Sequence, residues 1–293
     1  MYRRITQLIF ILFFNCIAYS MGSYSVLNIP QDARSLALNN TTSAFGNSLI
    51  HNNPASISMR SKGMGYSYLY FPAKLHMSCV QHLQRKNHFI RSIKILLFNY
   101  GTILDSKNQN ETFAYDGLFE LSYKKEIKDF ISIGISSGYL FSSISKFNSQ
   151  LVYGKFGIRN RFFRKKLGIG FSIENFGSII DSYTIFKEKI PKLFRSSFYY
   201  KLDYVPALIN IDFINNFNQL YYSIGSELKI QNNILMRLGI SNKNYIYYDN
   251  IVSTIFSNIS FGTGVNFTKF DLDIGFMNLG SSGFIIGVTI INK

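Results

Sequence analysis

Three histidines and one cysteine in a short stretch are the side chains of this sequence that most readily suggest metal chemistry. His76, Cys79, His82 and His88 lie close together in the chain, and imidazole and thiolate groups are the usual zinc ligands. Because a strand points successive side chains to opposite faces, His76 and His82 would share a face that Cys79 does not. His88 follows only after a predicted turn. We therefore expect no metal site here and no bound cofactor.

No arrangement of side chains is typical of an enzyme. All four histidines lie between residues 51 and 88, and none stands in a recognisable nucleophile motif. The runs Gly168-Ile169-Gly170 and Gly262-Thr263-Gly264 lack the rest of a dinucleotide-binding fingerprint. We predict a protein without catalytic activity, in which these glycines are strand residues beside crowded side chains.

The chain is strongly basic, with 31 Lys and Arg residues against 16 Asp and Glu residues and a formal net charge of +15. Its densest basic run extends from Arg159 to Lys166 and is interleaved with Phe162 and Phe163. We place this run in a tight turn between two strands. Such a turn suits a membrane surface with anionic headgroups better than nucleic acid, so no nucleic-acid partner is predicted.

The segments that would carry these side chains alternate between apolar and small or polar residues, with a period of two. Ile131, Ile133 and Ile135 alternate with serine and glycine, and residues 167–174 and 259–276 repeat the pattern with Gly, Ser and Asp on the second face. This alternation predicts strands with one apolar and one polar face. The segments are about ten residues long, which suits tilted membrane-crossing strands better than soluble strands of about 5 to 6 residues.

The pattern predicts an all-β protein: a transmembrane antiparallel β-barrel of about 14 strands, over residues 61–293. The longest expected connections, 102–111, 178–191 and 243–256, all fall on the same side. A soluble β-sandwich with its apolar face inward is the alternative. The expected strands are 62–72, 74–84, 88–101, 112–124, 129–143, 149–159, 165–177, 192–204, 207–216, 219–230, 233–242, 257–267, 269–279 and 283–292.

Residues 1–20 are typical of a secretory signal peptide. Arg3 and Arg4 precede an apolar run, and Ala18-Tyr19-Ser20 supplies small residues for cleavage near Ser20. This predicts export from the cytoplasm and, for a barrel, location in the bacterial outer membrane.

Residues 21–60 do not alternate, and we predict that they form a plug, or hatch, within the barrel. Pro30 and Pro54 hold the backbone extended, which suits an irregular plug. Arg34 is expected to pair with carboxylates on the lumen face, such as Asp271 or Asp273.

The same segment resembles a known family. Its motifs are Leu27–Ala37, which includes Asn28, Pro30, Ala33 and Arg34, and Asn53-Pro54-Ala55; Phe98–Thr102 and Asn175-Phe176-Gly177 follow further on. These are similar to the PorV/PorQ family of FadL-like outer-membrane barrels, and to PorQ in particular.

This resemblance implies a noncatalytic role in type IX secretion, in which the barrel binds secreted cargo, hands it on or supports its attachment to the cell surface. Its implied partners are outer-membrane lipid, secreted cargo proteins and other secretion components. The alternative is FadL-type transport of a hydrophobic small molecule through the lumen, with Asn53 and Pro54 near the gate.

Overall fold

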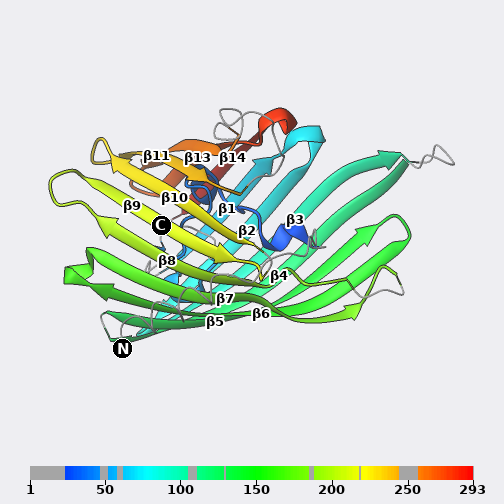
Figure 1. Ribbon diagram of the computed structural model, residues 1–293, viewed down its shortest axis with the longest axis horizontal. Coiled ribbons are helices and arrows are strands. Elements are labelled where there is room, and N and C mark those ends of the chain that lie inside the picture. Colours follow the sequence, from blue (N-terminus) through cyan, green and yellow to red (C-terminus); the bar gives the residue numbers. More distant parts are fainter. Residues whose placement is uncertain are drawn as a thin grey trace, which may run out of the picture.

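In the computed structural model, the strands close into a single barrel (Figure 1). The structure describes residues 24–46, 52–57, 62–104, 111–128, 130–184, 188–217, 219–243 and 257–292. Within these ranges, fourteen strands pair antiparallel in sequence order, and β1 (Lys62–Tyr70) closes the barrel against β14 (Phe284–Asn292). The predicted all-β barrel is thereby confirmed. The expected signal peptide, residues 1–20, lies outside the described residues.

The remaining strands follow the predicted map closely. They are β2 (His76–Lys86), β3 (Phe89–Leu104), β4 (Glu111–Lys128), β5 (Ile131–Ile144), β6 (Phe147–Phe162), β7 (Leu167–Asp181), β8 (Leu193–Lys201), β9 (Ala207–Asn215), β10 (Leu220–Lys229), β11 (Ile234–Ser241), β12 (Ile259–Asn266) and β13 (Phe270–Asn278).

The helical elements are short. They are η1 (Ser25–Leu27), α2 (Ala33–Ala37), η2 (Pro54–Ser56), η3 (Pro72–Lys74), η4 (Phe163–Lys165) and η5 (Gly280–Ser282). None of the helices in the described part of the chain is long and apolar enough to span a membrane.

The barrel carries its apolar side chains on the outside. On β14, Phe284, Ile286, Val288 and Ile290 are exposed, whereas Thr289 between them is buried. A sandwich would have buried the apolar face and exposed the polar one, so that alternative is wrong. Closure also leaves no edge strand and pairs the backbone groups of every strand with a neighbour.

The connections distinguish the two ends of the barrel. Those between β3 and β4, β7 and β8, and β11 and β12 are the long ones, and they leave from the same end because the strands alternate in direction. We call this the long-connection end and the opposite one the short-turn end, which lies at the left in Figure 1. The prediction that the three long connections share a side is confirmed.

The N-terminal segment, described over residues 24–46 and 52–57, packs against the inner face of the barrel wall. Helix α2 contacts β1 and β11 to β14, and η2 contacts β4 to β7. Toward the long-connection end, Val26, Leu27 and Leu36 join buried wall residues in one apolar cluster. The wall residues of this apolar cluster include Leu69, Met77, Leu96, Phe98, Leu118, Leu140, Leu151, Met277 and Ile285.

Candidate functional site

Helix α2 is positioned by its own capping residue and by the wall. The side chain of Asp32 accepts a hydrogen bond from the backbone N–H of Ser35 at 2.6 Å, as an N-cap residue does. The N–H of Ala33 donates to Oγ1 of Thr289 on β14 at 2.9 Å. Pro30, just before the helix, is buried, as is Arg34 within it. These contacts fix the direction in which Arg34 leaves the helix.

Arg34 forms an ion pair with the barrel wall. Its Nε lies 2.9 Å from Oε2 of Glu227 on β10, and its Nη1 donates to the carbonyl of Gly46 at 2.8 Å. Nε of Arg237, on β11, lies 2.7 Å from the same Glu227 oxygen. Both cations therefore share one carboxylate, and this chain of charges ties the N-terminal segment to two strands.

The two acids proposed from the sequence lie on the inner side of β13. Asp271 and Asp273 are both buried. Asp273 accepts from Nη1 of Arg237 at 2.6 Å, so it is joined to Arg34 through Arg237 and Glu227. Sequence reasoning missed Glu227 and Arg237, although each occupies an inward position of an alternating strand.

The Asn53-Pro54-Ala55 motif forms a tight turn against the wall. Oδ1 of Asn53 accepts from the N–H of Ala55 at 2.9 Å, and its Nδ2 donates to the carbonyls of Ile158 and Phe171, each at 3.3 Å. The carbonyl of Ala55 accepts from Oγ of Ser132 at 3.0 Å. One asparagine side chain thus caps η2 and joins it to two neighbouring strands.

Glycines on the inner face allow this close approach. A Cβ added at Gly157 would overlap Oδ1 of Asn53, and one at Gly134 would overlap the backbone of Pro54. On the opposite side, a Cβ at Gly275 would overlap the carbonyl of Ala33. The glycine-bearing strand faces seen in the sequence are therefore the surfaces on which the N-terminal segment rests.

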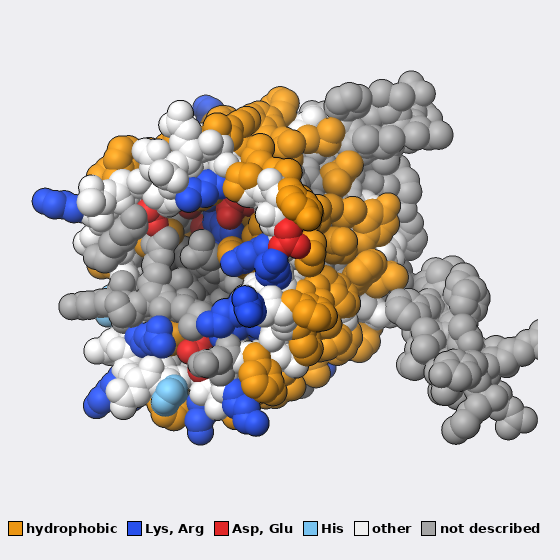
Figure 2. Space-filling view, turned by 90° about the vertical axis from the view of Figure 1, so that its left-hand side faces the viewer, with side chains coloured by type: hydrophobic (Ala, Val, Ile, Leu, Met, Phe, Trp, Pro, Cys, Tyr) orange, Lys and Arg blue, Asp and Glu red, His pale blue; other side chains and the backbone are white. Residues whose placement is uncertain are grey.

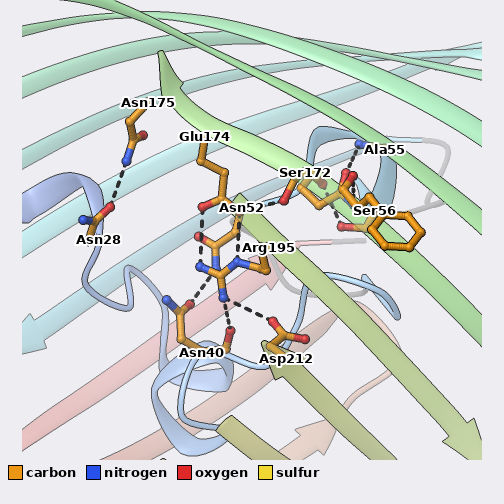
Figure 3. Close-up of polar contacts among 12 residues, drawn as sticks. Asn28, Asn40, Asn52, Ala55, Ser56, Ser172, Glu174, Asn175, Arg195 and Asp212 are labelled. Atoms are coloured by element: carbon orange, nitrogen blue, oxygen red, sulfur yellow. Dashed lines mark hydrogen bonds and ion pairs between the residues drawn. The ribbon is translucent and has the colours of Figure 1, made fainter. Parts of the chain in front are cut away.

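A second ionic cluster lies beside the segment. Nε of Arg195 on β8 lies 2.9 Å from Oε1 of Glu174, and its Nη1 lies 3.2 Å from Oδ2 of Asp212 (Figure 3). Nη1 also donates to the carbonyl of Asn40 at 3.4 Å. Oδ1 of Asn28 accepts from Nδ2 of Asn175 at 2.8 Å (Figure 3).

A third cluster centres on Glu120 of β4. Its carboxylate lies 2.9 Å from Nζ of Lys155 and 3.2 Å from Nζ of Lys94, and it accepts from the Tyr153 hydroxyl at 2.7 Å. Lys94 also donates to Oε1 of Gln31 in the N-terminal segment at 3.1 Å. These buried charges are matched by partners, as buried charges must be. They were not identified from the sequence because their partners lie on other strands.

The cysteine and histidines of β2 are distributed as the alternation predicts. Cys79 points inward into the apolar cluster, whereas His76 is half-buried and His82 is exposed on the other face. In the described ranges, no group of three or more His, Cys, Asp or Glu residues could hold a metal ion. The interior of the barrel therefore has two parts. One is the apolar cluster toward the long-connection end, and the other is a set of hydrogen bonds and ion pairs between the wall and the N-terminal segment.

Comparison with known proteins identifies the fold alone. No protein-family model matches the chain, and no curated protein matches it. Among solved structures, the toluene transporter TodX of Pseudomonas putida has a TM-score of 0.61 at 11% identity, covering 88% of this chain and 95% of that one. A Pseudomonas aeruginosa FadL homologue has a TM-score of 0.54 at 10% identity, covering 90% of this chain and 98% of that one.

Proposed function

We propose that this chain is a noncatalytic outer-membrane channel for hydrophobic small molecules, with residues 21–60 acting as the plug that closes it. The apolar cluster is the observation that carries this proposal. Its wall residues lie on the inner face toward the long-connection end, where a water-filled pore would carry polar side chains. An apolar lumen favours apolar ligands because they gain most from leaving water.

The exterior supports a location in the outer membrane. Exposed Leu, Ile, Phe and Tyr side chains recur along the strands, and such a surface is stable in lipid. The two structures with the same fold are described as a toluene transporter and a FadL homologue, in line with the FadL-type alternative. The role in type IX secretion stays a prediction, without support from these similar structures.

In this proposal the N-terminal segment must move for a ligand to pass. Val26, Leu27 and Leu36 occupy the apolar cluster, so an apolar ligand would have to displace them or pass beside them. The polar contacts of Arg34 and Asn53 with the wall would hold the segment in the closed position. Asn53 and Pro54 would lie at the gate.

Uptake by cells tests this function. Cells that express the chain should take up radiolabelled toluene or oleate several times faster than cells that lack it, whereas uptake of a sugar should be equal. Leu96→Gln places an amide in the apolar cluster and should reduce uptake; Leu97→Gln changes the adjacent, outward-facing leucine and should not. Equal hydrocarbon uptake with and without the chain would refute the proposal.

A further inference from the structure

Three cations meet at the short-turn end of the lumen. Arg159 and Arg161 lie two residues apart on β6 and both point inward, and Lys124 comes from the inner face of β4. All three are buried. The Lys201 ammonium lies nearby, 5.0 Å from the centre of the Phe45 ring, and Arg161 acts on it as a like charge. Figure 2 shows this end of the molecule, with several Lys and Arg side chains on it.

Glu126 is an acidic side chain that faces this cationic cluster. Its Oε1 lies 3.3 Å from Nζ of Lys124 and 3.6 Å from Nη2 of Arg161, and its Oε2 lies 3.7 Å from Nη2 of Arg85. Arg159 and Arg161 both act as like charges on Lys124. Among the described contacts, Glu126 is thus shared by several cations and balances only part of their charge.

In the described part of the chain, Arg159 lacks the close carboxylate partners that Arg195 and Arg237 have. Its Nη1 donates only a long hydrogen bond of 3.4 Å to the carbonyl of Phe45. Nε and Nη2 are buried and have no hydrogen-bond partner in the described part of the chain. By contrast, Arg195 and Arg237 each pair with two carboxylates. A guanidinium that is 3% exposed with two free nitrogens is costly unless an anion completes it.

We propose that Arg159, Arg161 and Lys124 form a binding site for a phosphate group. The planar fork of a guanidinium matches two oxygens of a phosphate, and an ammonium supplies a further donor. The cations around Glu126 outnumber this carboxylate among the described contacts, and a phosphate monoester of charge near −2 neutralises such an excess better than a carboxylate does. The phosphate is either free inorganic phosphate or the headgroup of a lipid such as phosphatidic acid.

This phosphate site is independent of the transport proposed above, because it lies at the short-turn end and shares no residue with the apolar cluster.

The site also explains why the basic run from Arg159 to Lys166 begins within β6, before the turn. Arg159 and Arg161 occupy inward positions, while Arg164 and Lys165 are exposed in the turn itself.

Calorimetric titration of the full chain in a nonionic detergent tests the site. Inorganic phosphate is titrated in one arm and dihexanoyl phosphatidic acid in the other, at neutral pH and without other oxyanions. Arg159→Gln should weaken binding about tenfold to a hundredfold, the usual effect of losing charge-assisted hydrogen bonds. Lys165→Gln removes the same charge from the exposed turn and should change affinity by less than about twofold.

The two arms separate the sources of the phosphate. Arg159-dependent binding of inorganic phosphate supports a free anion, and Arg159-dependent binding of the lipid alone supports a headgroup. Absence of binding in both arms, or equal weakening by Arg159→Gln and Lys165→Gln, overturns the proposal. Heat-modifiable gel mobility checks that each variant is folded. If Arg159→Gln does not fold, Arg159→Lys keeps the charge without the fork and should still lose most of the affinity.

Discussion

Single charged residues hold the N-terminal segment to the wall. Arg34 is buried, and its partner Glu227 is shared with Arg237. Because the surroundings exclude water, neither the arginine nor the carboxylate can recover its lost hydration if the other is removed. The effect of a substitution here should therefore be much larger than at an exposed ion pair of the same chemistry.

Arg34→Gln should lower the free energy of unfolding by about 3 kcal/mol, because it leaves a buried carboxylate with one cation fewer. It should also make the N-terminal segment easier to cleave with a protease. Denaturant unfolding in detergent and limited proteolysis measure the two effects. Lys166→Gln, which removes an exposed ion pair with Asp203, is the control and should change neither. Equal behaviour of the two variants would contradict the role of Arg34.

Tyr24 predicts a pH dependence in the alkaline range. Its hydroxyl lies 2.5 Å from Oγ of Ser149 and donates to Glu188 at 3.2 Å, and burial raises the pKa of Tyr24 to about 12. The folded chain then keeps a proton that an unfolded tyrosine loses near pH 10, so this contribution to stability is complete below about pH 10 and is lost as the pH rises toward about 12. Relative to Tyr24→Phe, the wild-type chain should lose thermal stability over that range; a constant difference would refute this.

Among the elements, the strands differ in the size of the side chain that fits at each position. Where α2 and η2 rest on the wall, inner positions include glycines and small hydroxyl-bearing residues, whereas elsewhere many inner positions carry charged or larger apolar side chains. Gly275 of β13 lies under the carbonyl of Ala33, whereas Gly117 occupies an outward position of β4, where an added Cβ would make only an ordinary contact, 3.7 Å from Cδ2 of Leu97. The two glycines therefore have opposite tolerance for a side chain.

Gly275→Ala should destabilise the fold by about 1–3 kcal/mol, the usual cost of overpacking, because the new methyl group must push α2 away from β13. Gly117→Ala should stay within about 0.5 kcal/mol of the wild type. Denaturant midpoints of the two variants, measured side by side, decide the matter. If Gly275→Ala is as well tolerated as Gly117→Ala, α2 does not rest on β13 as described.

For the whole molecule, the barrel reverses the usual arrangement of a soluble protein. Apolar side chains cover its exterior, and most of its buried charges are paired within. The exterior is then stable only against lipid or detergent, because so large a continuous apolar surface would associate in water.

Leu238→Arg tests this arrangement. Leu238 is 60% exposed in the middle of β11, and an arginine facing lipid near the midplane costs about 2–4 kcal/mol. The variant should insert poorly into lipid vesicles and unfold at lower denaturant concentration. Phe163→Arg, in the turn between β6 and β7, is the control and should cost about 0–1 kcal/mol. If Leu238→Arg instead made the chain soluble without detergent and left it folded, the exterior would not face lipid.

The sequence by itself determined the strands and the face of each residue, because alternation is a local property of an extended backbone. It therefore predicted that Cys79 and His82 lie on opposite faces of their strand, and the structure confirms this. Strand ends were less well defined. β4 and β6 extend beyond the predicted 112–124 and 149–159, because pairing with neighbouring strands continues past the last clear alternation.

Only the tertiary structure decided which inward residues meet. Arg34 and Glu227 are 193 positions apart, and their contact depends on closure of the barrel and on the path of the N-terminal segment inside it. The same closure left Arg159 with two buried nitrogens that have no hydrogen-bond partner among the described residues. A period of two identifies the strand face on which a charge lies, but it contains no information about the charge on the other side of the lumen.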